Sequence, residues 1–390
     1  MANVSSSNGL EKRPKLRFQG FDEPWKEVAF SQLYRYVSEK NDGTIGTDRV
    51  ISVANMYFKP DARVSSADYL KTYNLFRHGD IAFEGNKSKN FAFGRFVENT
   101  IGDGIVSHVF TVFRPIASNH NLDYWSYAIN NENVMGRILS RCTKKTTMMT
   151  NLVIDDFLVQ KICCPSEMEQ QRIAGFLKKI DDRIEKQTTL IETLKKYKRG
   201  LVKALISGTV AFDGSEHERW ETVSLAEIFT ISAGGDIDRQ NSSPSCSTSY
   251  PYPVYANALT NNGLYGYANY FKVKGDSITV SGRGEVGHAI ARHRKYVPIV
   301  RLLSLVPKYG DDVDFFAYMI NATSIYIEST GVPQLTSPQL GAVKVLRPPI
   351  CEQKRLSSLL MKMDAKLENE ERLTFYMEKI RAFMLQQLFI

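Results

Sequence analysis

The feature that most constrains this chain of 390 residues is an internal repeat. Residues 165–205 align without a gap to residues 348–388, and 11 of the 41 aligned pairs are identical. A segment that recurs at a fixed offset, here 183 residues, indicates a duplicated structural unit. The identical pairs include Pro165/Pro348, Glu169/Glu352, Gln170/Gln353, Arg172/Arg355, Asp181/Asp364 and Glu185/Glu368.

Apolar residues in both copies recur in alternating steps of four and three residues, which is the spacing of a heptad seam. Each copy follows a proline, a residue tolerated in the first turn of a helix. A core helix of an ordinary bundle could show one such pattern, but its recurrence in step favours a paired coiled coil. At about 1.5 Å per residue, each helix would be roughly 60 Å long. The residues expected to pair the helices are Ile173, Leu177, Ile180, Ile184, Leu194, Leu201, Leu356, Leu360, Met363, Leu367, Met377 and Met384.

Two positions of the predicted seam are polar in both copies. Gln187 aligns with Glu370, and Lys198 aligns with Arg381. Polar residues in a helix seam commonly fix its register or the choice of partner, at some cost in stability.

The segments before the two helices repeat more weakly. The run from Trp25 to Leu33 corresponds to the run from Trp220 to Ile228, and a Gly-Asp pair recurs at Gly79 and at Gly275. Both segments contain short β-branched and aromatic runs broken by Gly, Asn and Pro, such as residues 104–113 and 277–280. These runs predict mixed α/β modules with irregular sheets.

The predicted fold class is therefore α/β (α+β). Two globular domains would be joined by two long helices that pair as an antiparallel coiled coil, with pseudo-twofold symmetry and neighbouring chain ends. Two heads on a fixed spacer suit double-stranded DNA, whose half-sites can lie about 34–36 Å apart. The expected parts are a flexible lead-in (1–20), a first module (21–164), a first helix (165–207), a second module (208–347) and a second helix (348–390).

The net charge of +8 favours a polyanionic partner. The excess is unevenly spread, with 21 basic and 17 acidic residues in 1–164 but 12 and 13 in 206–347. Bulk charge therefore does not mark the modules as nucleic-acid binders. A local cluster is more informative, because only Glu285 opposes five basic residues between 283 and 301: Arg283, Arg292, Arg294, Lys295 and Arg301.

Other features bear on the compartment. No apolar run approaches the roughly 20 residues of a membrane helix, and residues 1–17 lack the apolar stretch of a secretory signal. The five cysteines form no metal-binding spacing. Their odd number, without a signal peptide, predicts reduced thiols, with Cys163 and Cys164 in the core. We expect a cytoplasmic protein without a metal.

The sequence contains no complete catalytic motif. Gly282–Gly287 matches GxGxxG, but the run 292–298 interrupts before a full helix, so we interpret it as a glycine-rich turn that presents Arg283. Residues 347–350 lack the polar and aromatic residues of an amino-methyltransferase loop. There is no phosphate-binding loop, and Asp155-Asp156 has no nuclease partner motif. His108 and His288 lie in strand-like apolar contexts, and we expect both to be core histidines. No catalytic residue is predicted.

Taken together, these residues resemble the specificity (S) subunits of type I restriction–modification systems, over nearly the whole chain. The resemblance rests on the duplicated Pro-x3-Glu-Gln-x-Arg starts at 165–173 and 348–356 with their heptad continuations. Weaker module motifs also fit, including Phe21-x3-Trp25, residues 79–85, residues 250–255 and residues 275–284.

The resemblance implies a non-catalytic subunit whose two target-recognition domains each read one half of a bipartite, asymmetric double-stranded DNA site. The helices would set the gap and dock two modification (M) subunits, which methylate adenine N6 with S-adenosylmethionine. Restriction (R) subunits would add ATP- and Mg-dependent cleavage. No cofactor is expected on this chain, and no membrane or small-molecule substrate is expected as a partner.

Sequence-specific binding requires side chains that match base edges, such as Arg or Lys for guanine and Asn or Gln for adenine. At least half of such contacts usually go to the backbone instead. For Tyr255, Tyr265 and Tyr267 we expect packing in the core. The predicted DNA-binding residues are Lys59, Asn86, Lys87, Lys89, Arg95, Asn257, Arg283, Arg292, Arg294 and Lys295.

Two other functions are compatible with tandem modules on paired helices. A coiled-coil structural adaptor would bind protein or glycan through its modules and would have no salt-dependent affinity for DNA. Tandem RNA recognition is the weakest candidate, because the aromatic signatures of RNA-binding modules are missing.

Overall fold

The computed structural model describes residues 3–4, 12–60, 68–146, 149–206, 220–323 and 334–390. The chain forms two compact units. Unit 1 comprises Met1–Gln187 with Leu373–Ile390, and unit 2 comprises Thr188–Arg372. Each unit therefore contains one globular module and a part of each long helix.

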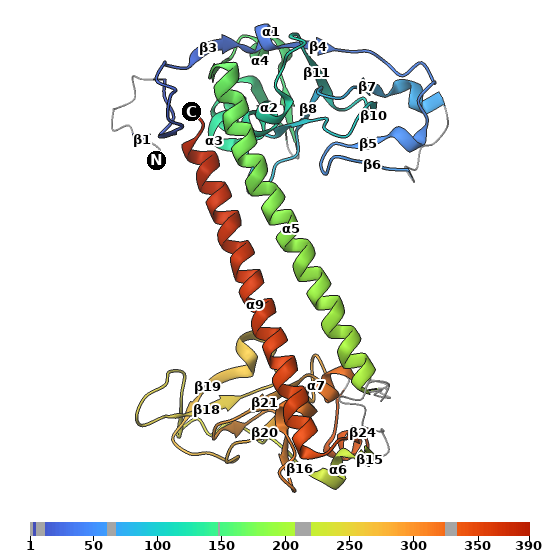
Figure 1. The fold of residues 1–390 in the computed structure, drawn as a ribbon, viewed down its shortest axis with the longest axis vertical. Helices are drawn as coiled ribbons and strands as arrows, with labels where there is room; N and C mark the ends of the chain where they lie inside the picture. Colours follow the sequence, from blue (N-terminus) through green and yellow to red (C-terminus); the bar gives the residue numbers. More distant parts are fainter. Residues whose placement is uncertain (1–2, 5–11, 61–67, 147–148, 207–219, 324–333) are drawn as a thin grey trace. The chain divides into compact units, whose positions relative to one another are not determined.

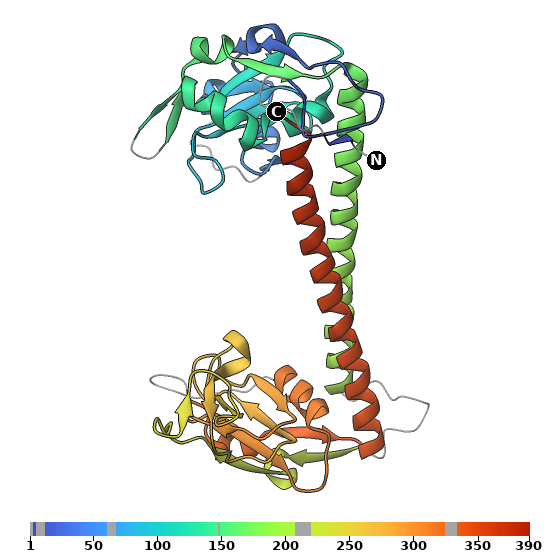
Figure 2. The same ribbon diagram turned by 90° about the vertical axis from the view of Figure 1, so that its left-hand side faces the viewer.

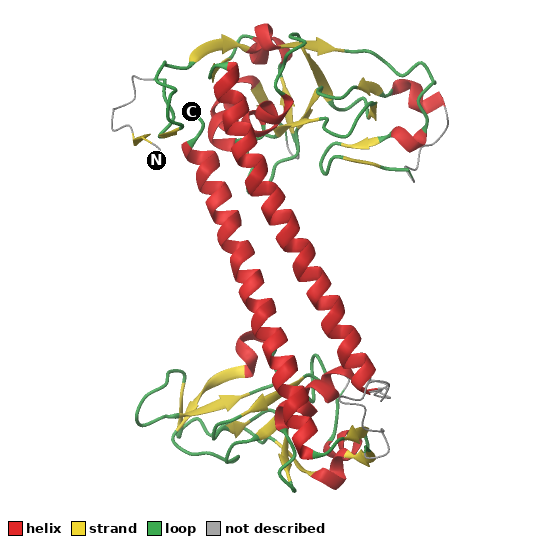
Figure 3. Cartoon of the chain, viewed as in Figure 1, coloured by secondary structure: helices red, strands yellow, loops and turns green. Residues whose placement is uncertain are grey.

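The two long helices are continuous and match the heptad segments (Figure 3). α5 spans Glu167–Ile206 and α9 spans Ile350–Gln387. The glutamine of each repeated motif ties its helix to the proline before it, because Gln170 donates to the Pro165 carbonyl at 3.1 Å and Gln353 donates to the Pro348 carbonyl at 2.8 Å. These equivalent bonds fix the path of the chain where it enters each long helix.

Module 1 is built on a four-stranded antiparallel sheet in the order β4–β11–β8–β9 (Figure 1). Helices α2 and α3 lie against β9. Buried aromatic rings form the core, such as those of Phe96 and Phe157, whose centres are 4.6 Å apart. Its elements are β1 (Asn3–Val4), β2 (Leu16–Arg17), β3 (Lys26–Ala29), α1 (Phe30–Leu33), β4 (Tyr34–Val37), η1 (Thr47–Arg49), β5 (Ile51–Ser52), β6 (Tyr57–Phe58), η2 (Asp68–Thr72), β7 (Asn74–Phe76), β8 (Ile81–Glu84), β9 (Arg95–Glu98), β10 (Gly104–Val106), β11 (Thr111–Pro115), α2 (Leu122–Ile129), α3 (Glu132–Cys142), β12 (Thr143–Lys145), β13 (Thr150–Leu152), α4 (Ile154–Leu158) and β14 (Lys161–Cys164).

Module 2 has a central antiparallel sheet in the order β16–β23–β20–β21, with α7 against β20 and β21. A second sheet, β17–β19–β18–β22, lies in the same module (Figure 2). Its elements are β15 (Glu221–Ser224), α6 (Leu225–Ile228), β16 (Phe229–Ala233), β17 (Ser242–Ser243), β18 (Tyr252–Tyr255), η5 (Thr260–Gly263), β19 (Leu264–Ala268), β20 (Ser277–Val280), β21 (Ala289–Arg292), β22 (Val297–Pro298), β23 (Leu303–Pro307), α7 (Val313–Ala322), α8 (Ser337–Gly341) and β24 (Lys344–Arg347).

The two central sheets correspond strand for strand, which confirms the duplicated mixed α/β frame. β4, β11, β8 and β9 match β16, β23, β20 and β21 in order and direction. The helix after the last strand of each central sheet in chain order is capped in the same way, since Asn121 accepts from the Tyr124 amide and Asp312 accepts from the Phe315 amide. The additions differ, because module 1 adds α3 and short strand pairs, whereas module 2 adds its second sheet.

The repeated tryptophans and glutamates attach each module to its own helix. The Trp25 indole donates to Glu169 at 3.2 Å, and the Trp220 indole donates to Glu352 at 2.8 Å. In addition, the strand that opens each module pairs with the strand that leads into the helix, β3 with β14 and β15 with β24. These contacts explain why tryptophan and glutamate recur in both halves of the chain.

The helices run antiparallel within each unit. In unit 1, Asp181 of α5 pairs with Arg381 of α9, and Phe176 lies with Met384 around one cavity. In unit 2, Lys195 pairs with Glu371 at 2.6 Å and Lys198 pairs with Asp364. The predicted seam positions are buried or half-buried, and Leu177 and Leu360 are at most 1% exposed.

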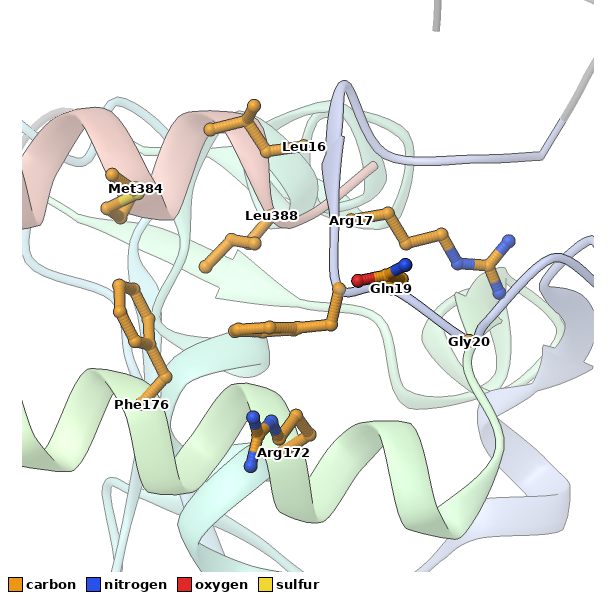
Figure 4. A pocket seen from close by; sticks show the side chains of 9 residues that line it. Leu16, Arg17, Gln19, Gly20, Arg172, Phe176, Met384 and Leu388 are labelled. Atoms are coloured by element: carbon orange, nitrogen blue, oxygen red, sulfur yellow. The ribbon is translucent and has the colours of Figure 1, made fainter. Parts of the chain in front are cut away.

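The lead-in expected over residues 1–20 is packed, not flexible, from Leu16 onward. Leu16 and Arg17 line a cavity of about 600 Å³ together with residues of α5 and α9. Figure 4 shows the side chains around it. Phe18 packs edge-on against Phe176 at 5.5 Å, and the Arg17 guanidinium donates to Glu169 at 2.8 Å. An aromatic ring and a buried ion pair outweigh the polar composition from which flexibility was expected.

Candidate nucleic-acid interface

A hydrogen-bonded triad joins module 1 to both helices of unit 1. The Tyr127 hydroxyl, on α2, donates to Asp181 Oδ2 at 2.8 Å. Asp181, on α5, also accepts from the Arg381 guanidinium of α9. Burial, and then the Asp181 carboxylate, raise the pKa of Tyr127, and the bond to Asp181 raises the pKa of Arg381. The carboxylate thus links three helices.

The same triad recurs in unit 2. The Tyr318 hydroxyl, on α7, donates to Asp364 Oδ2 at 2.6 Å, and Asp364 pairs with Lys198 of α5. The Lys198 ammonium lies 5.0 Å from the centre of the Tyr318 ring. Lys198 and Arg381 are one of the two polar seam pairs of the sequence repeat, and the structure gives each a module tyrosine and a helix aspartate as partners.

The aspartates and tyrosines of these triads were not among the predicted site residues. A signal for the aspartates was present, because Asp181 and Asp364 are an identical pair in the repeat. The tyrosines carry no such signal, since Tyr127 and Tyr318 are 191 residues apart, not 183. Only the folded modules bring them to the helices.

Three of the predicted DNA-binding residues of module 1 lie in the hairpin between β8 and β9. Asn86, Lys87 and Lys89 are exposed there, and the Lys87 ammonium donates to the Thr146 carbonyl at 2.9 Å. Lys59 is exposed just after β6, outside that hairpin. The hairpin therefore gathers two cations and an amide on one surface loop.

Arg95 has a different setting from these residues. Its Nε donates to the buried Glu84 carboxylate at 2.7 Å, and its Nη2 donates to the Ala54 carbonyl at 2.8 Å. The guanidinium also lies over the Phe91 ring at 5.2 Å. Arg95 thus fastens the base of the β8–β9 hairpin and does not extend from its tip.

In module 2, Asn257 and Arg283 come together. The Asn257 side chain accepts from the Gly282 amide at 2.8 Å, and Arg283 follows in an exposed turn. The Arg283 guanidinium donates twice to Gln334 Oε1, at 2.8 and 3.1 Å. This turn joins β20 to β21, so it occupies the place that the β8–β9 hairpin occupies in module 1.

Arg292 differs from the expectation of a surface contact, because its side chain is buried. The residue is only 7% exposed, and its guanidinium stacks on Tyr255 at 3.7 Å. It also donates to Thr279 at 3.0 Å and to the Asn262 carbonyl at 2.7 Å. Burial lowers the pKa of Arg292. The side chain supports the loop at 256–263 from beneath.

Arg294 and Lys295 lie at the other end of the central sheet from Arg283. Both are exposed, and the Lys295 ammonium lies 4.6 Å from the centre of the Phe271 ring. The neighbouring His293 pairs with Asp276 and Asp314, and the bond to Asp276 raises its pKa. The structure therefore divides the predicted basic cluster of module 2 into two separate groups.

Several other expectations need correction. His108 and His288 are exposed, because both lie in turns next to strands and not inside them. Tyr265 is 60% exposed, whereas Tyr255 is buried as expected. Cys164 is buried and Cys163 is half-buried, and both are free thiols.

Two further observations concern metals and membranes. No group of acidic, histidine and cysteine side chains within the described ranges could hold a metal ion. Among the same residues, every helix is too short or too polar to cross a bilayer.

The comparisons with known proteins agree with this architecture. The family model for the type I restriction modification DNA specificity domain matches residues 29–196 and 217–374. A putative type I specificity subunit of Mycoplasma pneumoniae is 26% identical over 192 residues, which are 49% of this chain and 52% of that protein. The C-terminal part of another from the same organism is 32% identical over 94 residues, 24% of this chain and 65% of that protein. The chain thus aligns with less than two thirds of each relative.

Solved structures share the fold over almost the full length. The S subunit of a type I restriction–modification system from M. genitalium superposes with a TM-score of 0.59 at 18% identity, covering 97% of this chain and 99% of that one. The HsdS subunit of Thermoanaerobacter tengcongensis has a TM-score of 0.51 at 13% identity, covering 95% and 98%. With the family model matched twice, the chain belongs to the type I restriction modification DNA specificity domain family.

Proposed function

We propose that this chain is the DNA-sequence-specificity subunit of a type I restriction–modification complex. Each module acts as a target-recognition domain that reads one half of a bipartite double-stranded DNA site. The observation that carries the proposal is one structural frame that occurs twice with different surface loops. Base readout depends on the side chains that a loop brings to a groove, so a shared frame with unlike loops suits two different half-sites.

The two modules carry different side chains at equivalent hairpins. The β8–β9 hairpin offers Lys87 and Lys89, whereas the β20–β21 hairpin offers Arg283 on a glycine-rich turn. Lysine acts as a point charge, whereas arginine presents a planar fork that matches the edge of guanine. The proposed target is therefore an asymmetric sequence and not a palindrome.

The two long helices set the unspecified gap between the half-sites and bind the modification subunits. α9 supports the docking role, because a second apolar stripe runs beside its seam. Leu373, Tyr376, Ile380 and Phe383 follow steps of three, four and three residues, and each is 42–55% exposed. Such a stripe has the spacing that a further packed helix requires.

In this proposal, chemistry belongs to the partners. M subunits supply S-adenosylmethionine and adenine-N6 methylation, and R subunits supply ATP- and Mg-dependent cleavage. The chain carries recognition alone and acts in the cytoplasm, where chromosomal and incoming DNA are found.

The test is to co-express the full chain with the modification subunit from the same genome. We expect the two to co-purify, and the complex to bind duplex DNA with an affinity that falls steeply as salt rises. The chain alone should not methylate DNA. A stable complex without salt-dependent DNA binding would favour the structural adaptor, and methylation by the chain alone would overturn the assignment.

A further inference from the structure

Three segments of module 2 meet at one end of its central sheet. They are the turn after β16 at Gly234–Gly235, the β20–β21 turn at Gly282–Arg283, and the pair Val300–Arg301 just before β23. Backbone bonds join the first to the third, because the Arg301 amide donates to Gly234 at 3.0 Å and the Val300 amide donates to Gly235 at 2.8 Å. Backbone hydrogen bonds to the turn after β16 thus fix the position of Val300 and Arg301.

Val300 and Arg301 both have left-handed backbone conformations, with φ values of 53° and 61°. Side chains disfavour this region, and a β-branched residue such as valine disfavours it most. Conformations of this kind persist only where the surroundings impose them, and they concentrate at binding sites. Both side chains nevertheless point to solvent, since Val300 is 47% exposed and Arg301 is exposed. The packing of these two side chains therefore does not offset the cost of their left-handed backbone conformations.

Asn257 connects this strained pair to the neighbouring turn. Its amide nitrogen donates to the Val300 carbonyl, and its amide oxygen accepts from the Gly282 amide at 2.8 Å. Gly282 is pressed against the pair, because a Cβ there would lie 2.9 Å from the Arg301 carbonyl oxygen. Only glycine permits this approach. The next residue, Arg283, is therefore fixed close to Arg301.

The two arginines differ in what holds them. The Arg283 guanidinium is bound to Gln334. Within the part of the chain that the structure describes, no hydrogen bond or ion pair engages the Arg301 guanidinium. Its backbone is rigid while its donors are unused, which is the arrangement that an accurately placed contact needs. A contact to phosphate would need only a mobile cation, whereas a bidentate contact to a base requires a fixed position and direction.

We propose that Arg301 is a base-reading residue of module 2, and that it donates to O6 and N7 of a guanine in the major groove of its half-site. Asn257 and Gly282 are positioning residues for this contact. The corresponding turn of module 1, at residues 107–110, contains no arginine, so the contact belongs to one half-site alone. This inference rests on the proposed function.

The experiment uses the full chain in complex with its modification subunit, and selects bound duplexes from a random DNA library. We expect the wild type to select a bipartite motif that contains a G·C pair in the half-site of module 2. Arg301→Ala should lose preference at that pair by roughly tenfold or more, while the other half-site stays unchanged. Arg301→Lys keeps the charge, and should lose most of the preference too because lysine lacks the fork. Lys308→Ala, which removes one charge at the opposite end of β23, should leave the motif intact.

The outcomes separate this inference from the function on which it rests. The unchanged half-site of module 1, together with the remaining base preferences in the half-site of module 2, reports that each variant complex is folded. If Arg301→Ala and Arg301→Lys keep every base preference and lose only overall affinity, Arg301 contacts phosphate and this inference fails. The proposed function would then still stand. If the wild type itself selects no motif, the proposed function fails with it.

Discussion

Glu98 of β9 offers a quantitative test of the packing of module 1. The residue is 4% exposed, and neither carboxyl oxygen has a hydrogen-bond partner among the described residues. Burial, with a smaller contribution from Asp123, raises its pKa from 4.5 to about 9. At neutral pH the folded protein therefore contains an uncharged carboxylic acid at this position, whereas the unfolded chain carries a carboxylate.

The sign of the effect follows from proton uptake on folding. Between pH 4.5 and about 9 the folded state binds one more proton at Glu98 than the unfolded state, so stability falls as pH rises through this window and levels off above it. One pKa unit corresponds to about 1.4 kcal/mol, so the cost at pH 7 is about 3 kcal/mol. Glu98→Gln removes the ionisable group and should stabilise unit 1 by about that amount at pH 7, and by nothing near pH 4.5.

The assay is urea unfolding of the full chain in a Trp220→Phe background. The remaining tryptophans, Trp25 and Trp125, then report on unit 1 alone. In a parallel thermal unfolding experiment, a gain of about 3 kcal/mol should raise the melting temperature of unit 1 by roughly 6–12 °C. His120, whose pKa burial lowers to about 4, weakens the fold below pH 6.5 in both proteins, so its contribution cancels.

Glu84→Gln is the matched control, because it makes the same change on the adjacent strand at a carboxylate that Arg95 pairs at 2.7 Å. This control should destabilise the protein, since it weakens a charge-assisted bond. The reasoning is refuted if Glu98→Gln gives no gain at pH 7, or if the difference from wild type is the same at pH 5 and pH 8.

Three further predictions concern the helices. Arg381→Met should lower the stability of unit 1 by about 1–2 kcal/mol, because it leaves the half-buried Asp181 without its cation. Adding Asp181→Leu should restore part of the loss, and a further loss in the double variant would contradict this. The double variant Ile380→Glu/Phe383→Glu should stay folded but no longer co-purify with the modification subunit, whereas the exposed control Gln386→Glu should still co-purify. Normal co-purification of the double variant would exclude the stripe as the docking face. Inserting four residues into α5 should change the gap between the half-sites while the half-sites stay the same, as read by selection of bound DNA, and an unchanged gap would count against the spacing role.

The helices were predictable because their determinants are local and periodic. The heptad spacing placed them at 165–207 and 348–390, close to the observed Glu167–Ile206 and Ile350–Gln387. The antiparallel direction followed from the order of the chain and is observed within each unit. The repeated glutamates and glutamines were recognised as a motif, but their bonds to Trp25, Trp220 and the prolines required the fold.

The candidate site was less predictable because charge in a sequence does not indicate burial. Arg283 and Arg292 looked alike in the basic cluster, yet Arg283 is exposed whereas Arg292 is buried against Tyr255, 37 residues earlier in the chain. Arg301 was visible as a charge, but its left-handed backbone depends on Gly234, Gly235 and Asn257, which come from other loops. Such contacts between distant segments decide which side chains face a partner.

The most direct test of the central claim is a methylation map of DNA from cells that express this chain with its modification subunit. The account predicts N6-methyladenine within one bipartite motif, made of two different half-sites separated by a gap of constant length. The same cells without the chain should lack that motif. A palindromic motif, a variable gap, or methylation that does not depend on the chain would contradict the account.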